Sequence, residues 1–132
     1  MLGSSNDRNI ELSLPAERDM MIVVRLAASG VLARWGLTLD AMGDVKMAVE
    51  EACSCLISQL SGEGRLEVVF EAGDGCVWTH LSCAPGCAMG EAMDPSELEV
   101  AKCILESLAD EVVFAQQDGH ITAIDLKAAL PR

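Results

Sequence analysis

The sequence is poor in aromatic and basic residues. Aromatic residues make up 3% of the 132 positions, and tyrosine is absent. Nine lysines and arginines stand against 21 aspartates and glutamates, which gives a formal net charge of −12 at pH 7. A surface this acidic repels phosphate backbones and anionic lipids, and few rings are available to stack on nucleic-acid bases. We therefore expect neither nucleic acid nor a membrane as a partner.

Long apolar runs are missing as well. The most apolar stretch, residues 20–35, contains Arg25 and Arg34 and is too short and too charged to cross a bilayer. The first nine residues are polar and contain no apolar segment typical of a signal peptide. Without a secretory signal, the six cysteines indicate reduced thiols rather than disulfides. These features predict a cytoplasmic protein.

Hydrophobic residues, in contrast, make up 51% of the chain, which is enough for a packed core. No internal repeat, low-complexity tract or long linker divides the sequence. A chain of 132 residues suits one compact unit. We therefore expect a single domain over residues 1–132.

The spacing of the apolar residues predicts strands and helices in a definite order. Apolar residues alternate with polar ones in the strand segments and recur at threes and fours in the helical ones. Gly36 is expected to end the first helix, and Asp40 and Asp94 are expected to cap the second and third. In chain order, the expected elements are a strand (8–14), two helices (16–35 and 40–60), a hairpin (65–71 and 76–83), a helix (94–108) and a second hairpin (111–117 and 120–127).

A helix layer on one face of a mixed, mostly antiparallel sheet is the economical way to pack these elements. We therefore predict the α+β class and a two-layer α/β sandwich.

Residues 44–55 read DVKMAVEEACSC. This string resembles the N-box helix of the anti-sigma-factor serine kinases, whose pattern is roughly D-hydrophobic-K-x-A-V-x-E-A-x-T-N. Residues 34–37 and 107–112 are similar to two further segments of that family. The family belongs to the GHKL (Bergerat-fold) ATPase superfamily, and the order of elements from Ile10 to Leu130 agrees with it.

The resemblance implies a histidine-kinase-like ATPase fold with an ATP site between the helix layer and the sheet. It implies a regulator of transcription that phosphorylates a serine on a small anti-anti-sigma protein or binds a sigma factor. It also implies homodimers that form through the sheet or through N-terminal elements.

By family position, Glu51 is the catalytic acid, which takes the proton from an attacking hydroxyl during phosphoryl transfer. The alternative interpretation is a solvated glutamate on an amphipathic helix. Four residues later, Cys55 stands where the family has an asparagine whose oxygen coordinates Mg²⁺, and a thiol is a poor ligand for that hard cation. Ser54 is adjacent but is expected to point about 100° away around the helix.

Two further boxes of the family are changed. In the D-x-G-x-G box, Ser82 stands at the aspartate that binds adenine, Ala84 and Gly86 stand at the two glycines, and only Gly86 fits the pattern. The lid segment, residues 84–101, contains four acidic residues and no lysine or arginine. A triphosphate would meet repulsion where it needs hydrogen-bond donors. We therefore expect negligible ATP affinity, no cofactor and no metal.

Other candidate sites involve His80, Cys76, Cys83 and Cys87. Their spacing is not that of a common structural zinc site, and strand parity places Cys83 on the opposite side from His80. Ordinary core or loop thiols are therefore favoured over a metal site or a Cys–His catalytic pair. A stress-sensing thiol protein that depends on Cys83 or Cys87 is a further hypothesis.

The leading functional prediction is an anti-sigma-factor-like regulatory protein that acts by protein–protein binding. Its partner would be a sigma factor or an anti-anti-sigma protein, and its nucleotide site would be degenerate. Its acidic surface suits a basic partner. The alternative is an active ATP-dependent serine kinase with ATP and magnesium as cofactors. That enzyme would use Glu51 as base, Cys55 beside the metal and Ser82 at adenine.

Overall fold

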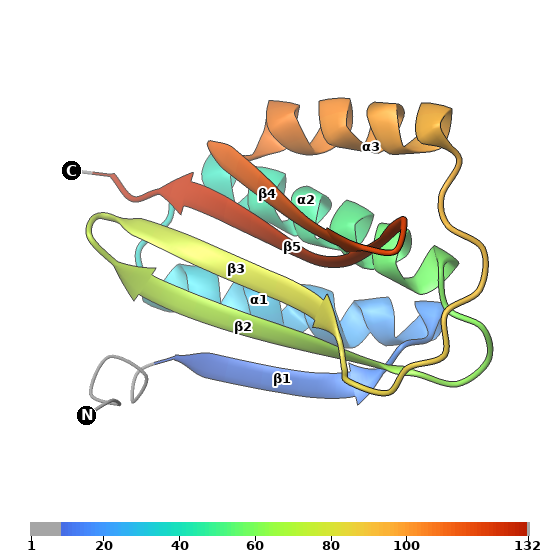
Figure 1. The fold of residues 1–132 in the computed structure, drawn as a ribbon. Coiled ribbons are helices and arrows are strands. Elements are labelled where there is room, and N and C mark those ends of the chain that lie inside the picture. The colour runs from blue at the N-terminus through green and yellow to red at the C-terminus, as the bar shows by residue number, and fades with distance from the viewer. Residues whose placement is uncertain (1–8, 132) are drawn as a thin grey trace.

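The computed structural model describes residues 9–131, which form a five-stranded sheet covered on one face by three helices (Figure 1). The predicted order of elements and the α+β sandwich are confirmed. No helix in this part of the chain is both long and apolar enough to cross a membrane. The elements are β1 (Ile10–Pro15), the 3-10 turn η2 (Arg18–Met20), α1 (Met21–Arg34), α2 (Leu39–Ser58), β2 (Arg65–Gly73), β3 (Cys76–Cys83), α3 (Pro95–Leu108), β4 (Glu111–Gln117) and β5 (His120–Ala129).

The strands lie in the order β1-β2-β3-β5-β4, and every neighbouring pair is antiparallel. We expected a mixed sheet. β3 and β4 do run in the same direction, with the single helix α3 between them in the chain. However, β5 lies between these two strands and is antiparallel to both, so no parallel pair forms among the described strands.

Capping side chains explain where two of the helices begin. Thr38, not Asp40, is the N-cap of α2, because its hydroxyl accepts a hydrogen bond from the backbone N–H of Ala41 at 3.1 Å. Asp40 instead lies in the first turn, where a negative charge favours the helix N-terminus. Asp94 caps α3 as predicted, since its carboxylate accepts the N–H of Ser96 at 3.0 Å.

The boundaries near the N-terminus differ from those we expected. The first helix begins at Met21 instead of residue 16. The N–H of Ala16 donates to the carbonyl of Gly64 at 2.9 Å, and this bond keeps residue 16 beside the loop that leads into β2. Gly36 adopts φ +83° and ends α1, as predicted. The expected start of the first strand at Arg8 lies outside the described residues.

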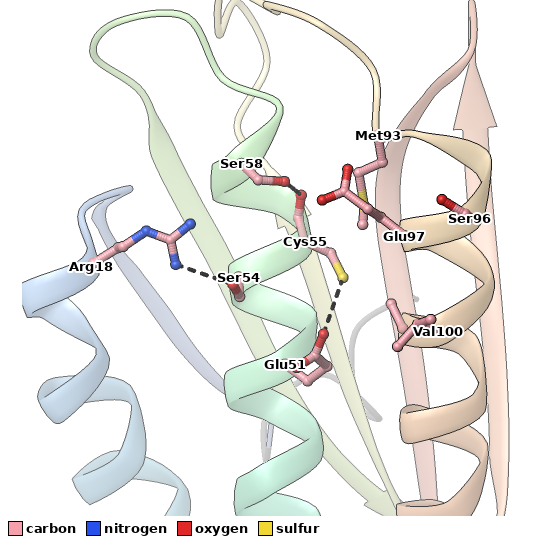
Figure 2. A pocket seen from close by; sticks show the side chains of 10 residues that line it. Arg18, Glu51, Ser54, Cys55, Ser58, Met93, Ser96, Glu97 and Val100 are labelled. Carbon is pink, nitrogen blue, oxygen red and sulfur yellow. Dashed lines mark hydrogen bonds between the residues drawn. The ribbon is translucent and has the colours of Figure 1, made fainter.

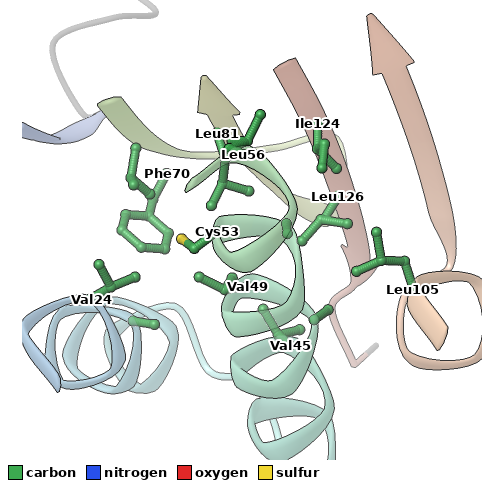
Figure 3. Packing of buried hydrophobic residues seen from close by; sticks show 14 of the residues in the cluster. Val24, Val45, Val49, Cys53, Leu56, Phe70, Leu81, Leu105, Ile124 and Leu126 are labelled. Carbon is green, nitrogen blue, oxygen red and sulfur yellow. The ribbon is translucent and has the colours of Figure 1, made fainter. Parts of the chain in front are cut away.

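The core lies between the two layers (Figure 3). Phe70, Leu81 and Ile124 of the sheet are at most 1% exposed, as are Val49 and Leu56 of α2. Burying a side chain of this size contributes roughly 1.5–3 kcal/mol. This packing fixes the orientation of α2 and leaves its opposite face turned toward solvent.

Candidate functional site

An open cavity of about 470 Å³ lies between α2 and the first half of α3 (Figure 2). On each helix the lining residues are spaced at threes and fours, so they share one side of that helix. No described residue of the sheet lines the cavity, which opens between the helices above the core. The lining residues are Glu51, Ser54, Cys55 and Ser58 of α2, Arg18 of η2, and Met93, Ser96, Glu97, Val100 and Ala101.

Glu51 and Cys55 meet on the α2 wall, one helical turn apart. The Cys55 thiol donates a weak hydrogen bond to Glu51, with Sγ 3.9 Å from Oε2. Burial, followed by the charge and the hydrogen bond of Glu51, raises the pKa of Cys55 to about 11. The thiol is therefore neutral at pH 7 and offers a metal ion neither an oxygen nor a thiolate.

Ser54 lines the same cavity, although its place on the helix was expected to direct it away. Its hydroxyl accepts a hydrogen bond from Nη1 of Arg18 at 3.1 Å. The Ser58 hydroxyl, one turn later, donates to the backbone carbonyl of Cys55 at 2.8 Å. Arg18 is the one cation among the lining residues, and this contact holds it at the Ser54 edge.

The structure does not bring Ser82 to this cavity. Ser82 pairs with Glu67 across β2 and β3, and together with His80 it lines a separate depression of about 260 Å³. Strand alternation is the cause: Leu81 is buried beneath the helices, so Ser82 points to the opposite face of the sheet. The structure therefore separates Ser82 from the Glu51 cavity, and its role at adenine stays a prediction of the resemblance.

Ala84 and Gly86 belong to a tight turn after β3. The Ala84 N–H donates to the Arg65 carbonyl at 2.9 Å, and the Cys87 N–H donates to the Ala84 carbonyl at 3.3 Å. Gly86 has φ +88°, a conformation that favours glycine. Neither residue lines the Glu51 cavity, and their nucleotide-binding role by family position stays a prediction. Of the predicted site residues, the cavity unites only Glu51 and Cys55.

Residues 84–90, the first part of the segment 84–101 where the resemblance implies a nucleotide lid, are hydrogen-bonded to neighbouring elements. The Ser61 N–H donates to the Ala88 carbonyl at 2.9 Å, and the Gly90 N–H donates to the Gln59 carbonyl at 2.6 Å. Nε2 of His120 also lies 2.6 Å from the Gly90 carbonyl. These bonds tie Ala88 and Gly90 to the end of α2 and to β5, and Met93 is the residue of this segment that lines the cavity.

Gln59 is an organising residue that the sequence analysis missed. Its side chain is 1% exposed; Nε2 donates to the Ile121 carbonyl at 2.9 Å, and Oε1 accepts the Ile121 N–H at 2.8 Å. β3 pairs with β5 only as far as Ser82 with Ala123, so Ile121 lies beyond the end of β3. The side-chain amide of Gln59 thus makes the two hydrogen bonds to Ile121 that a longer β3 would otherwise make. One sequence signal could have identified it: Gln59 is a polar residue three positions after Leu56, on the apolar face of the helix.

A second group of titratable residues lies on the open face of the sheet. Nδ1 of His80 is 2.8 Å from Oδ1 of Asp125, and its Nε2 is 3.0 Å from Oε1 of Glu71. Trp78 stacks on the imidazole, with ring centroids 5.9 Å apart. Burial lowers the pKa of His80, but the hydrogen bonds and charges of the two carboxylates outweigh it and raise the pKa above its ordinary value.

The cysteines do not assemble with His80. Cys83 packs against the core on the helix side of β3, and burial, together with nearby Cys87, raises its pKa to about 11. The Cys87 sulfur accepts the Arg65 N–H at 3.4 Å. Within residues 9–131, no group of three or more His, Cys, Asp or Glu side chains could hold a metal ion.

The lining of the cavity does not fit a magnesium-bound triphosphate. Cys55 stands where the resemblance places a metal-coordinating asparagine, its thiol is neutral, and the carboxylate of Glu97 faces the same space. At the N-terminus of α3, Asp94 already accepts an N–H bond and Pro95 has none to donate. Phosphate would therefore meet repulsion and few free donors.

Comparisons with known proteins found similar sequences among the serine-protein kinases. Serine-protein kinase RsbW of Bacillus velezensis is 49% identical over 132 residues, covering 87% of this chain and 82% of the relative. RsbW of Halalkalibacterium halodurans is 42% identical over 55 residues, or 42% of this chain and 34% of that protein. No family model matches the chain.

A solved structure also resembles the fold. The crystal structure of the RsbU and RsbW domains of a Mycobacterium tuberculosis protein superposes with a TM-score of 0.69 at 17% sequence identity. The match covers 94% of this chain and 33% of that one, so the present chain spans about a third of that protein. At this identity, the likeness shows a shared fold.

Proposed function

The chain belongs to the family of the RsbW serine-protein kinases, and we propose that it is an anti-sigma-factor regulator that acts by binding. Its partner in the cytoplasm is a sigma factor or an anti-anti-sigma protein. Its nucleotide site is degenerate and uses neither ATP nor magnesium. Homodimer formation, which the family resemblance implies, is part of the same proposal.

One observation carries this proposal. Cys55, the residue at the family's metal-coordinating position, is 2% exposed and donates a weak hydrogen bond to Glu51. A neutral thiol in that place cannot supply the oxygen that Mg²⁺ prefers. The carboxylate of Glu97, which faces the same space, adds repulsion toward phosphate.

The alternative is an active serine kinase, and a separate observation favours it. Glu51 lines an open cavity, where a partner's hydroxyl can reach its carboxylate. The relatives named above are serine-protein kinases by name. In this alternative, Glu51 takes the proton of the attacking serine.

Calorimetric titration with Mg-ATP separates the two functions. We expect no binding heat up to about 1 mM, which corresponds to a binding free energy weaker than about 4 kcal/mol. A pull-down with candidate sigma factors and anti-anti-sigma proteins is expected to retain one of them equally with and without Mg-ATP. Micromolar ATP binding, or phosphate transfer to a serine of the retained protein, would establish the kinase instead.

The variant Cys55→Asn sharpens this test, because it restores an amide oxygen at the metal position. We expect it to remain unable to bind Mg-ATP, since the Glu97 carboxylate and the capped N-terminus of α3 are unchanged. Binding gained by this single change would mean that the thiol alone blocks the site, and that the rest of the cavity accepts phosphate.

A further inference from the structure

We propose that the cavity between α2 and α3 is a binding site for a lysine or arginine side chain presented by a protein partner. The cationic group lies between Glu51 and Glu97, and the aliphatic stem lies against Met93 and Val100. The inference rests on the proposed function only for the assignment of that side chain to the regulated partner.

The first argument is the uncompensated charge of the two walls. Glu51 projects from α2, and Figure 2 shows the Glu97 carboxylate directed from α3 toward α2. The ion pairs found among residues 9–131 involve other carboxylates: Glu50, Glu71, Glu111 and Asp125. Glu51 itself accepts the weak hydrogen bond from the Cys55 thiol. Two carboxylates therefore face one cavity without a basic side chain between them.

The second argument is the position of Arg18. Its guanidinium donates to Ser54 at 3.1 Å, on the far side of α2 from α3, as Figure 2 shows. The lining thus combines two negative charges with one positive charge that is held at the edge. An incoming cation is attracted into the part of the cavity between Glu51 and Glu97, whereas an incoming anion is repelled from it.

The third argument is the apolar part of the lining. Val100 is 60% exposed, and Met93 and Ala101 lie beside it. Ile104, one turn beyond Val100 on α3, is 37% exposed and continues this apolar strip. Lysine and arginine combine an aliphatic stem with a charged end, so one side chain satisfies both the apolar strip and the carboxylates. A small inorganic cation would leave the strip uncovered.

The overall charge of the chain indicates the source of this side chain. With a formal net charge of −12, the protein attracts basic proteins over a distance and repels acidic ones. The cavity is open on the outer face of the helix layer, where a second protein can insert a side chain without any rearrangement of the core. A basic residue at the centre of a partner's contact surface fits this arrangement.

Nuclear magnetic resonance titration tests the site without knowledge of the partner. The probes are Nα-acetyl-lysine amide, Nα-acetyl-arginine amide and the uncharged Nα-acetyl-norleucine amide. We expect the two cationic probes to shift backbone signals of residues 51–58 and 96–101 more than those around other carboxylates such as Glu71. The norleucine probe should produce no such saturable shift.

Matched variants test the role of the two carboxylates. The double variant Glu51→Gln with Glu97→Gln should weaken binding of the lysine probe about fivefold to thirtyfold, as expected for two exposed charge contacts. The control double variant Glu99→Gln with Glu106→Gln removes the same charge from exposed α3 positions that do not line the cavity. It should leave this affinity within about twofold.

The proposal is overturned if the control variant weakens binding as much as the cavity variant, or if the norleucine probe binds equally well. It is also overturned if MgCl₂ alone, or Mg-ATP, saturates the same signals at lower concentration than the lysine probe. Failure to retain any sigma factor or anti-anti-sigma protein refutes the proposed function but leaves the probe result intact. The two failures are therefore distinguishable.

Discussion

Replacement of Gln59 by methionine should lower the free energy of unfolding by about 2–6 kcal/mol. Methionine has a similar length and remains compatible with the buried surroundings, so loss of volume is a minor contribution. The main loss is of the two hydrogen bonds to the backbone of Ile121, at 2.9 and 2.8 Å. Each backbone group left buried without a partner costs roughly 1–3 kcal/mol, and two groups are affected.

Urea unfolding followed by circular dichroism measures this loss, and Gln117→Met is the matched control. Gln117 is exposed on β4, so its replacement should change the unfolding free energy by less than about 0.5 kcal/mol. Hydrogen exchange adds a local test, because the Ile121 amide should lose protection in Gln59→Met. A loss below about 0.5 kcal/mol at an unchanged denaturant slope, with Ile121 still protected, would refute the role assigned to Gln59.

Three further measurements test other parts of the structure. Thr38→Ala should lower the free energy of unfolding in urea by about 1 kcal/mol, because the α2 cap is lost, and Asp40→Ala should lower it by clearly less. If Asp40→Ala were the more destabilising of the two, Asp40 would be the cap after all. The pKa of His80 is raised on folding, so its contribution to stability is fully present below the unfolded value of about 6.5 and is lost as pH rises through the folded value. The stability difference between wild type and His80→Gln should therefore be larger at low pH than at high pH, and a constant difference would contradict this. Gly64→Ala should lower Tm, because the new Cβ would lie 3.0 Å from Leu60 Cδ1 and 3.2 Å from Cys87 Sγ. An unchanged Tm would mean that these two side chains move aside at little energetic cost.

Periodicity and turn residues predicted most of the fold because they report on local geometry. The apolar stripe of α2, from Val45 to Leu56, has one clear face, and that face is buried. Helix α1 is different, since apolar residues occur on nearly all of its sides. Val24 is fully buried, whereas Ile22 and Leu26 are 57% and 66% exposed, and spacing alone does not select between them. Tertiary packing makes that choice.

The candidate site was predictable only where it depends on one helix. Glu51 and Cys55 lie four residues apart on α2, and helical geometry alone brings them together. Ser82 required a comparison between distant segments, and alternation along β3 places it on the other face of the sheet. Glu97 joins Glu51 through the packing of α3 beside α2, which no local pattern specifies.

The position of β5 has a consequence for folding during synthesis on the ribosome. β5 is synthesised after β4, yet it occupies the place between β3 and β4. Until its residues emerge, β3 has a bare edge and β4 has no strand to join. The sheet is therefore completed by a late strand that closes two ladders at once, and until then the edge of β3 is open to pairing with another chain.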